Sequence, residues 1–217
     1  MKSIAVKVLI GTLVAGTVAT GVVFANFEDN YESYLRKQGR ELLTSGSDKW
    51  NTLKTKYSKE GDGLLITIED KPVQKTDLQP EQLKEWCLAN NKGKFTNTKD
   101  EIYQRVSAWC TEPKTIVEKI GLENILDDTE PATPSGTGVA QTLNQALWTR
   151  KAQNYNTEGN TILIKQINNS SAEGTEDIRV SAATEAILRA WCRFSKNKHF
   201  KHEEDARYKA YLSWCTK

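Results

Sequence analysis

The sequence lacks every common catalytic signature, since it contains no GxxxxGK[ST], GxGxxG, GxSxG or HExxH pattern. Its cysteines do not form the C-x(2–4)-C pairs with which zinc ribbons and fingers bind their metal. The net charge is only +2 over 217 residues, so no global charge excess favours a nucleic acid or another polyanion. We therefore expect a non-enzymatic protein with no metal, no cofactor and no nucleic-acid partner.

Histidine is scarce, and both histidines, His199 and His202, lie in the segment RFSKNKHFKHEED. This segment also contains the basic residues Arg193, Lys196, Lys198 and Lys201. One interpretation is a patch for sulfated glycans, phospholipid or nucleic acid; the simpler one is a solvated loop between two helices. The matching loop earlier in the chain, NNKGKFTNTK, has no histidine, which argues against a shared catalytic role. An exported hydrolase or nuclease is left as a distant alternative.

The N-terminus carries an export signal. After Lys2 and Lys7, residues 8–25 contain no charge. Either this is a signal peptide cleaved after Ala25, or it is an uncleaved anchor at the short end of the length that spans a bilayer. In both cases the positive end stays in the cytoplasm and the rest of the chain lies outside. No cysteine stands near the end of the segment, which excludes a lipoprotein anchor.

The four cysteines form two frames of equal length, each cysteine preceded directly by tryptophan. The frames are Trp86-Cys87 with Trp109-Cys110, and Trp191-Cys192 with Trp214-Cys215. An even cysteine number behind an export segment favours disulfides. Four cysteines allow three connectivities, and the simplest pairs each frame within itself.

Further landmarks recur in register, which indicates a duplicated unit. Trp50, Tyr57, Glu60 and Gly61 are repeated as Trp148, Tyr155, Glu158 and Gly159, so all six tryptophans are expected to be structural. Short apolar runs follow at 64–68 and 162–165, and their β-branched residues predict extended segments. The expected fold is mainly α: two tandem small helical repeats, each with a short extended segment and a helix–loop–helix carrying a disulfide.

The expected domains follow from these landmarks and from composition. They are 1–25, the signal peptide or anchor; 26–46, a juxtamembrane helix or linker; 47–128, the first Trp/Cys repeat with a connecting helix; 129–141, a Pro/Gly/Thr linker; and 142–217, the second Trp/Cys repeat. Within the helix–loop–helix segments, Asp100 and Asp205 are expected at helix N-termini, where the dipole favours a negative charge. Phe95 and Phe200 are expected to fill the gap between the two helices.

The order of these motifs is similar to that of a known group of proteins. The motifs are Trp86-Cys87, Asp100, Tyr103 and Trp109-Cys110-Thr111, then Trp191-Cys192, Asp205, Tyr208 and Trp214-Cys215-Thr216. With the uncharged N-terminal segment, they resemble the large paralogous, uncharacterised surface and membrane protein families of haemotropic mycoplasmas. The resemblance implies a surface-exposed, membrane-associated protein of cell-wall-less bacteria that live on red blood cells. It supplies no catalytic residue, and this chain departs from single-unit members by having two units.

Together these observations predict a membrane-associated surface protein for host interaction or antigenic display. Its expected partner is a host cell-surface protein or glycan, and the N-terminal segment is its contact with the membrane. The C-terminal region is expected to be extracellular, or secreted if cleavage occurs after Ala25. The main alternative is a scaffold that pairs with other membrane proteins of the same cell.

Overall fold

The computed structural model describes residues 30–129, 143–168 and 172–217. The expected signal peptide or anchor lies outside these ranges, as does all but the first residue of the expected linker 129–141. Within the described ranges no helix is both long and apolar enough to cross a membrane. The described chain is α plus β, with eight α-helices, one short 3₁₀ helix and two small antiparallel sheets.

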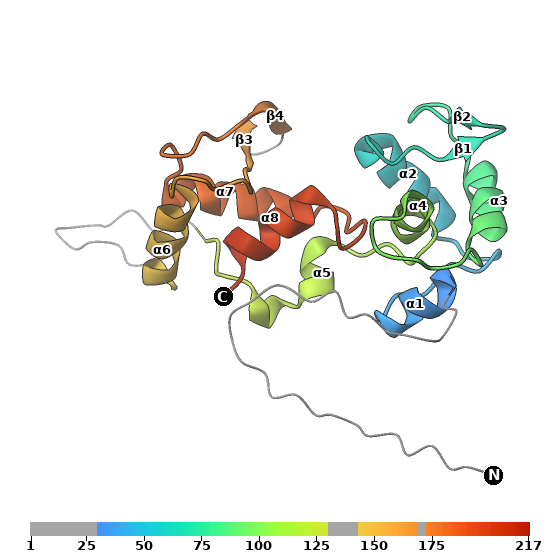
Figure 1. Ribbon diagram of the computed structural model, residues 1–217, viewed down its shortest axis with the longest axis horizontal. Helices are drawn as coiled ribbons and strands as arrows, with labels where there is room; N and C mark the ends of the chain where they lie inside the picture. Colours follow the sequence, from blue (N-terminus) through green and yellow to red (C-terminus); the bar gives the residue numbers. More distant parts are fainter. Residues whose placement is uncertain (1–29, 130–142, 169–171) are drawn as a thin grey trace, which may run out of the picture.

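The elements fall into two halves along the chain (Figure 1). Those of residues 30–112, the first half, are α1 (Tyr31–Lys37), α2 (Trp50–Glu60), β1 (Thr67–Ile68), β2 (Lys71–Pro72), α3 (Pro80–Asn90) and α4 (Glu101–Trp109). Those of the second half, from residue 113 on, are α5 (Ile116–Ile120), η1 (Leu122–Asn124), α6 (Gln145–Tyr155), β3 (Lys165–Asn168), β4 (Ala172–Asp177), α7 (Glu185–Ser195) and α8 (Ala206–Cys215). In the sheets Ile68 pairs with Lys71, and Ile167 pairs with Glu173.

Each half has its own hydrophobic core, and the tryptophans lie in these cores. The first core contains Trp50, Trp86 and Trp109, and the second contains Trp148, Trp191 and Trp214. None of the six is more than 7% exposed. A buried tryptophan removes a large apolar area from water, so three in a unit of this size supply much of its hydrophobic stabilisation.

The two disulfides pair within the frames, as the simplest connectivity predicted. Cys87 is bonded to Cys110 with 5.4 Å between their Cα atoms, which ties α3 to the end of α4. Cys192 is bonded to Cys215 with 5.7 Å between their Cα atoms, which ties α7 to α8. Both Cα distances lie in the range that a disulfide requires. In each half, the disulfide therefore joins the first helix of the pair to the C-terminal end of the second.

The apolar runs are held by tyrosine hydroxyls rather than by long strands. The Tyr57 hydroxyl accepts the N–H of Ile66 at 3.0 Å, and the Tyr155 hydroxyl accepts that of Ile164 at 3.1 Å. Only the residues after these isoleucines enter the sheets, and each run then turns back as a hairpin. The expected extended segments thus lead into the first strands of two β-hairpins and overlap them only at their ends.

The segment expected as a juxtamembrane helix or linker and the expected connecting helix both contribute residues to the hydrophobic cores. In the predicted juxtamembrane segment 26–46, Tyr31 and Leu35 of α1 are buried in the first core. The connecting helix, predicted to close the first repeat, is helical only in α5 (Ile116–Ile120) and η1 (Leu122–Asn124). Ile116 of α5 and Leu126 after η1 lie in the second core, so this segment packs on the other half. Which core receives this segment depends on contacts far along the chain, so the sequence did not predict it.

Asp100 and Asp205 lie at the N-termini of α4 and α8, as expected. The Asp100 carboxylate accepts the N–H of Tyr103 at 2.7 Å, and the Asp205 carboxylate accepts that of Tyr208 at 3.0 Å. Each carboxylate therefore caps a free amide in addition to facing the positive end of the helix dipole.

Replacing both Cys87 and Cys110 with serine is expected to lower the free energy of unfolding by about 3 kcal/mol, because the bond closes a loop with a sequence separation of 23 residues. The Cys192–Cys215 bond closes a loop of the same length, so the same exchange there should cost a similar amount. Urea unfolding measures both losses. Non-reducing peptide mapping provides the control, and a peptide joining Cys87 to Cys192 or Cys215 would contradict the architecture.

Candidate functional site

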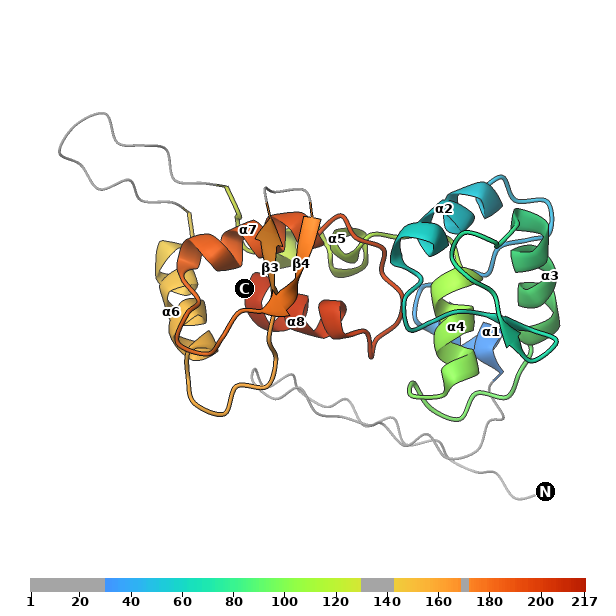
Figure 2. The ribbon, with the colours of Figure 1, turned by 90° about the horizontal axis from the view of Figure 1, so that it is seen from above.

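The loop between α7 and α8 reaches across to the first half, toward α4, in both ribbon views (Figures 1 and 2). His199, Phe200, Lys201 and His202 are each 8% exposed or less. The two interpretations of this basic segment, an exposed patch and a solvated loop, are therefore both wrong for its centre. The loop is instead the main contact between the two halves.

Backbone hydrogen bonds anchor this loop beside the start of α5. The Phe200 N–H donates to the Lys114 carbonyl at 2.9 Å, and the Ile116 N–H donates to the Lys198 carbonyl at 3.0 Å. His199 forms a single antiparallel β-bridge with Thr115 between these bonds. These backbone bonds fix the loop against the residues at the start of α5. Its contacts with the first half are additional to them.

A buried arginine of the first half holds the loop from the other side. Gly39, at a φ of +69°, ends α1 and lets the chain turn so that Arg40 points inward. The Arg40 guanidinium donates from Nη1 to the Lys201 carbonyl at 3.0 Å and to the Ser107 hydroxyl. Its Nη2 donates to the Ser107 carbonyl and to the Thr111 hydroxyl, both at 2.5 Å. Arg40 is only 2% exposed. We call Arg40, Ser107, Thr111, His199 and Lys201 the junction.

The charge of Arg40 is compensated by dipoles and an aromatic face, because all four of its acceptors are carbonyl or hydroxyl oxygens. Its guanidinium carbon lies 4.7 Å from the centroid of the Phe200 ring, in cation–π geometry. Burial lowers the pKa of Arg40 to about 10, and the charge of Glu203 acts in the opposite direction. Arg40 is therefore still charged at neutral pH.

Around the junction, the acidic end of the loop contacts the first half. The Tyr103 hydroxyl donates to the Glu203 carboxylate at 2.8 Å, and the Thr98 hydroxyl donates to the Glu204 carboxylate at 3.0 Å. Burial, followed by the Glu203 charge, raises the pKa of Tyr103 far above its usual value, so this phenol stays protonated and donates. Polar contacts thus surround the buried guanidinium.

His199 makes a second contact between the loop and the first half. Its Nε2 lies 2.7 Å from the Ala108 carbonyl oxygen, its Nδ1 lies 3.2 Å from the Lys114 carbonyl oxygen, and its ring stacks on Trp109. Burial lowers the pKa of His199 to about 4, and the two carbonyls oppose this shift. The imidazole is therefore neutral at pH 7. Since it then carries one N–H, it donates to only one of the two carbonyls.

Arg40, Ser107 and Thr111 were not singled out in the sequence. Thr111 was visible only as the last residue of the W-C-T motif. Its hydroxyl donates to the Ser107 carbonyl as that of its counterpart Thr216 donates to the Leu212 carbonyl, so the motif does not predict the contact with Arg40. Arg40 lies in the charged segment RKQGREL, where nothing distinguishes it from Arg36. The single local signal is the glycine before it.

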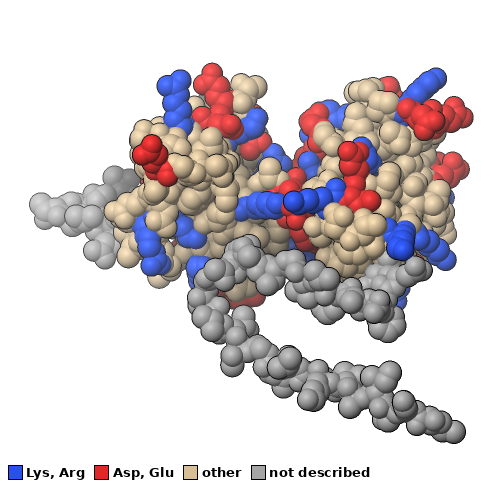
Figure 3. All heavy atoms as spheres, in the orientation of Figure 1, with Lys and Arg blue, Asp and Glu red and all other residues tan. Residues whose placement is uncertain are grey.

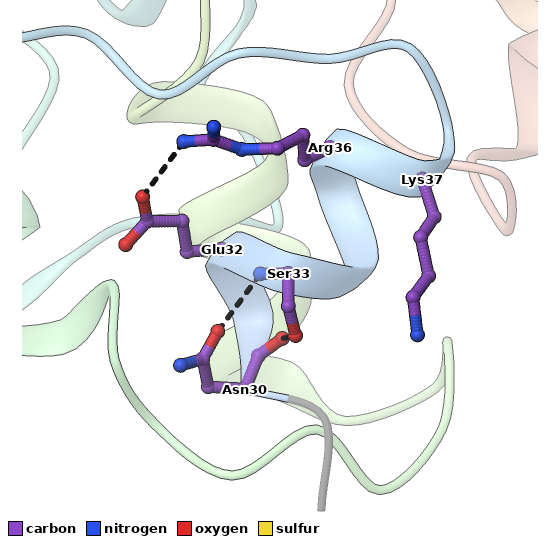
Figure 4. Close-up of a pocket in the computed structure, with 5 residues that line it drawn as sticks. All are labelled: Asn30, Glu32, Ser33, Arg36 and Lys37. Atoms are coloured by element: carbon purple, nitrogen blue, oxygen red, sulfur yellow. Dashed lines mark hydrogen bonds and ion pairs between the residues drawn. The ribbon is translucent and has the colours of Figure 1, made fainter. Parts of the chain in front are cut away.

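The cavities of the described residues include one on α1, away from the junction, and one that adjoins the junction at Lys201. One of about 580 Å³ lies along α1 and is lined by Asn30, Glu32, Ser33, Arg36 and Lys37 (Figure 4). Its drawn contacts, from Arg36 to Glu32 and from Ser33 to Asn30, are local to one short helix, so they indicate no ligand. The other, of about 400 Å³, lies between the two halves and is lined by residues of both. Figure 3 shows the notch between the halves, with charged side chains of both signs along it.

The described residues contain no group of three or more His, Cys, Asp and Glu side chains that could hold a metal ion. Comparison with known proteins gives no match, whether to family models, to curated proteins or to solved structures.

Replacing Arg40 with methionine is expected to lower the free energy of unfolding by about 2 kcal/mol, because buried carbonyl and hydroxyl oxygens lose their charged donor. Arg36→Met is the matched control from the same segment. The Arg36 side chain is 74% exposed and pairs only with Glu32, so its loss should cost under about 0.5 kcal/mol. Urea unfolding of both variants tests this, and equal costs would contradict the role assigned to Arg40.

The low pKa of His199 predicts a loss of stability in acid. The unfolded chain protonates this histidine near pH 6.5, and the folded chain only near pH 4, so the free energy of unfolding should fall as the pH drops through this window. The loss attributable to His199 is about 3 kcal/mol at pH 4. Burial also lowers the pKa of His202, which acts in the same direction. Subtracting the curve of His199→Gln from that of the wild type isolates His199, and parallel curves would refute the prediction.

Proposed function

We propose that this chain is an exported, membrane-associated surface protein that acts by binding rather than by catalysis. The observation that carries the proposal is the pair of disulfides, Cys87–Cys110 and Cys192–Cys215. Such bonds persist in oxidising environments and are rare inside cells. They agree with the uncharged segment at residues 8–25, which predicts export. The tight bonding of the halves at the junction would present them as one rigid surface.

We further propose that the two halves are tandem copies of one unit. Matching contacts support this: the Leu43 N–H donates to the Cys110 carbonyl and the Leu126 N–H donates to the Cys215 carbonyl, both at 2.8 Å. The start of each unit pairs with its helix–helix loop, Asn30 with Lys94 and Thr115 with His199. The copies would therefore begin near Asn30 and Thr115, earlier than the landmarks in the sequence suggested.

The indole N–H groups add a second set of matching contacts. That of Trp50 donates to the Thr44 carbonyl at 3.0 Å, and that of Trp148 donates to the Asp127 carbonyl at 2.9 Å. Three pairs of corresponding contacts of this kind do not follow from helical periodicity alone, so they favour duplication over two unrelated helical segments.

The proposed role is contact with a host cell surface, or antigenic display on the bacterial surface. The resemblance to surface protein families of haemotropic mycoplasmas supports this role, and the charged outer surface leaves room for variation around the stapled cores. The alternative is a scaffold that pairs with other membrane proteins of the same cell.

The test is binding of the purified, oxidised full-length chain to red blood cells, together with its recognition by sera from infected hosts. We expect saturable binding, serum recognition, or both. The matched control is the same protein after reduction and alkylation of the cysteines, which should lose binding if the folded surface is the ligand site. Absence of both signals would overturn the proposal. Crosslinking in whole cells that captures only bacterial membrane proteins would favour the scaffold instead.

A further inference from the structure

The cavity of about 400 Å³ between the halves, the inter-half groove, is rich in basic side chains. The first half contributes the end of α2, and the second contributes β3, β4 and the α7–α8 region. The basic residues that line it are Lys59, Lys165, Lys198, Lys201 and Arg207. A volume of this size accommodates a small-molecule group the size of a substituted sugar.

The carboxylates of the groove are already paired. Arg207 lies 3.5 Å from the Glu60 carboxylate and 2.6 Å from the Glu173 carboxylate, so it joins the two halves across the groove. The Asp62 carboxylate is paired with Lys75 at 2.7 Å. The groove lining has five basic residues against three carboxylates, so its net charge is positive.

Lys201 is the most constrained of these lysines. It is 8% exposed, and within the described part of the chain its ammonium makes no hydrogen bond or ion pair. Its carbonyl accepts from both Arg40 and Ser107, so its backbone cannot readily move away from the groove. Burial lowers the pKa of Lys201, whereas Asp205, Glu60 and Asp62 raise it. A buried cation without a direct partner is costly, and an anion in the groove would offset that cost.

Lys198 adds a second charge beside it. Its ammonium lies 4.0 Å from the centroid of the Phe194 ring and lines the same groove. Lys59, exposed at the end of α2, supplies a charge from the opposite half. Several ammonium groups around one cavity suit a compact group with more than one negative oxygen, such as a phosphate or sulfate ester, better than a lone carboxylate.

We propose that the inter-half groove binds a phosphate or sulfate ester group, with Lys201 as its main donor and with Lys198 and Lys59 as supporting charges. The inference rests on the proposed function, since it names the ligand chemistry of the binding protein. The junction and the groove share one loop, so the contact that joins the halves also positions the lysine that receives the ligand.

The test titrates the oxidised full-length chain with inorganic phosphate, glucose 6-phosphate and glucose 6-sulfate, monitored by calorimetry at fixed ionic strength. We expect saturable binding of at least one ester, and the preferred ester separates a phosphorylated source from a sulfated one. Lys201→Met should weaken that binding about tenfold, because it removes a charged hydrogen-bond donor. The control Lys92→Met, at an exposed lysine in the first half, should leave affinity unchanged.

Lys59→Met provides a second variant that does not depend on a buried position, and it should weaken binding two- to fivefold. Equal affinity of wild type, Lys201→Met and Lys59→Met would overturn the proposal, and so would an absence of saturable binding to all three probes. Ester binding without cell or serum recognition would refute the proposed function alone. Cell binding that Lys201→Met leaves intact, with no ester binding, would refute the groove alone.

Discussion

The arrangement of the two halves depends on one buried guanidinium. Arg40 has no carboxylate among its acceptors, so its charge is tolerated only while carbonyl and hydroxyl oxygens surround it. Those oxygens come from α4, from the W-C-T segment after it and from the loop of the second half. Moving any of the three segments would leave a buried donor unsatisfied. The Arg40 side chain therefore links the end of α4 to the loop between α7 and α8.

The same loop has two faces with different chemistry. Toward the junction it presents the Lys201 carbonyl and the neutral ring of His199, which bond to the first half. Toward the groove it presents the ammonium of Lys201 beside the ion pairs of Arg207. The backbone of the loop thus joins the two halves, while the side chains of Lys198 and Lys201 line the groove. This division explains why a segment so basic is mostly buried.

The two halves use similar frames but different loops. In the first, Phe95 stacks on Tyr34 with 3.7 Å between ring centroids, which closes the loop onto its own α1. In the second, Phe200 is fully buried and lies under the Arg40 guanidinium. The gap-filling role predicted for both phenylalanines thus describes only part of what Phe200 does. His199, which has no counterpart in the first loop, contacts the first half through the Ala108 carbonyl and Trp109, so its presence in one loop only has a structural reason.

The sequence by itself determined what is local or periodic. The equal Cys–Cys spacing indicated the disulfide pairing, and the repeated landmarks and N-terminal aspartates indicated the helix pairs. It did not determine which core receives Ile116, why His199 is buried, or that Arg40 differs from Arg36. These features depend on contacts between residues up to 161 positions apart, such as Arg40 with Lys201. A charged side chain has the same appearance in a sequence whether it meets water or a ring of carbonyls, and only the tertiary structure decides between them.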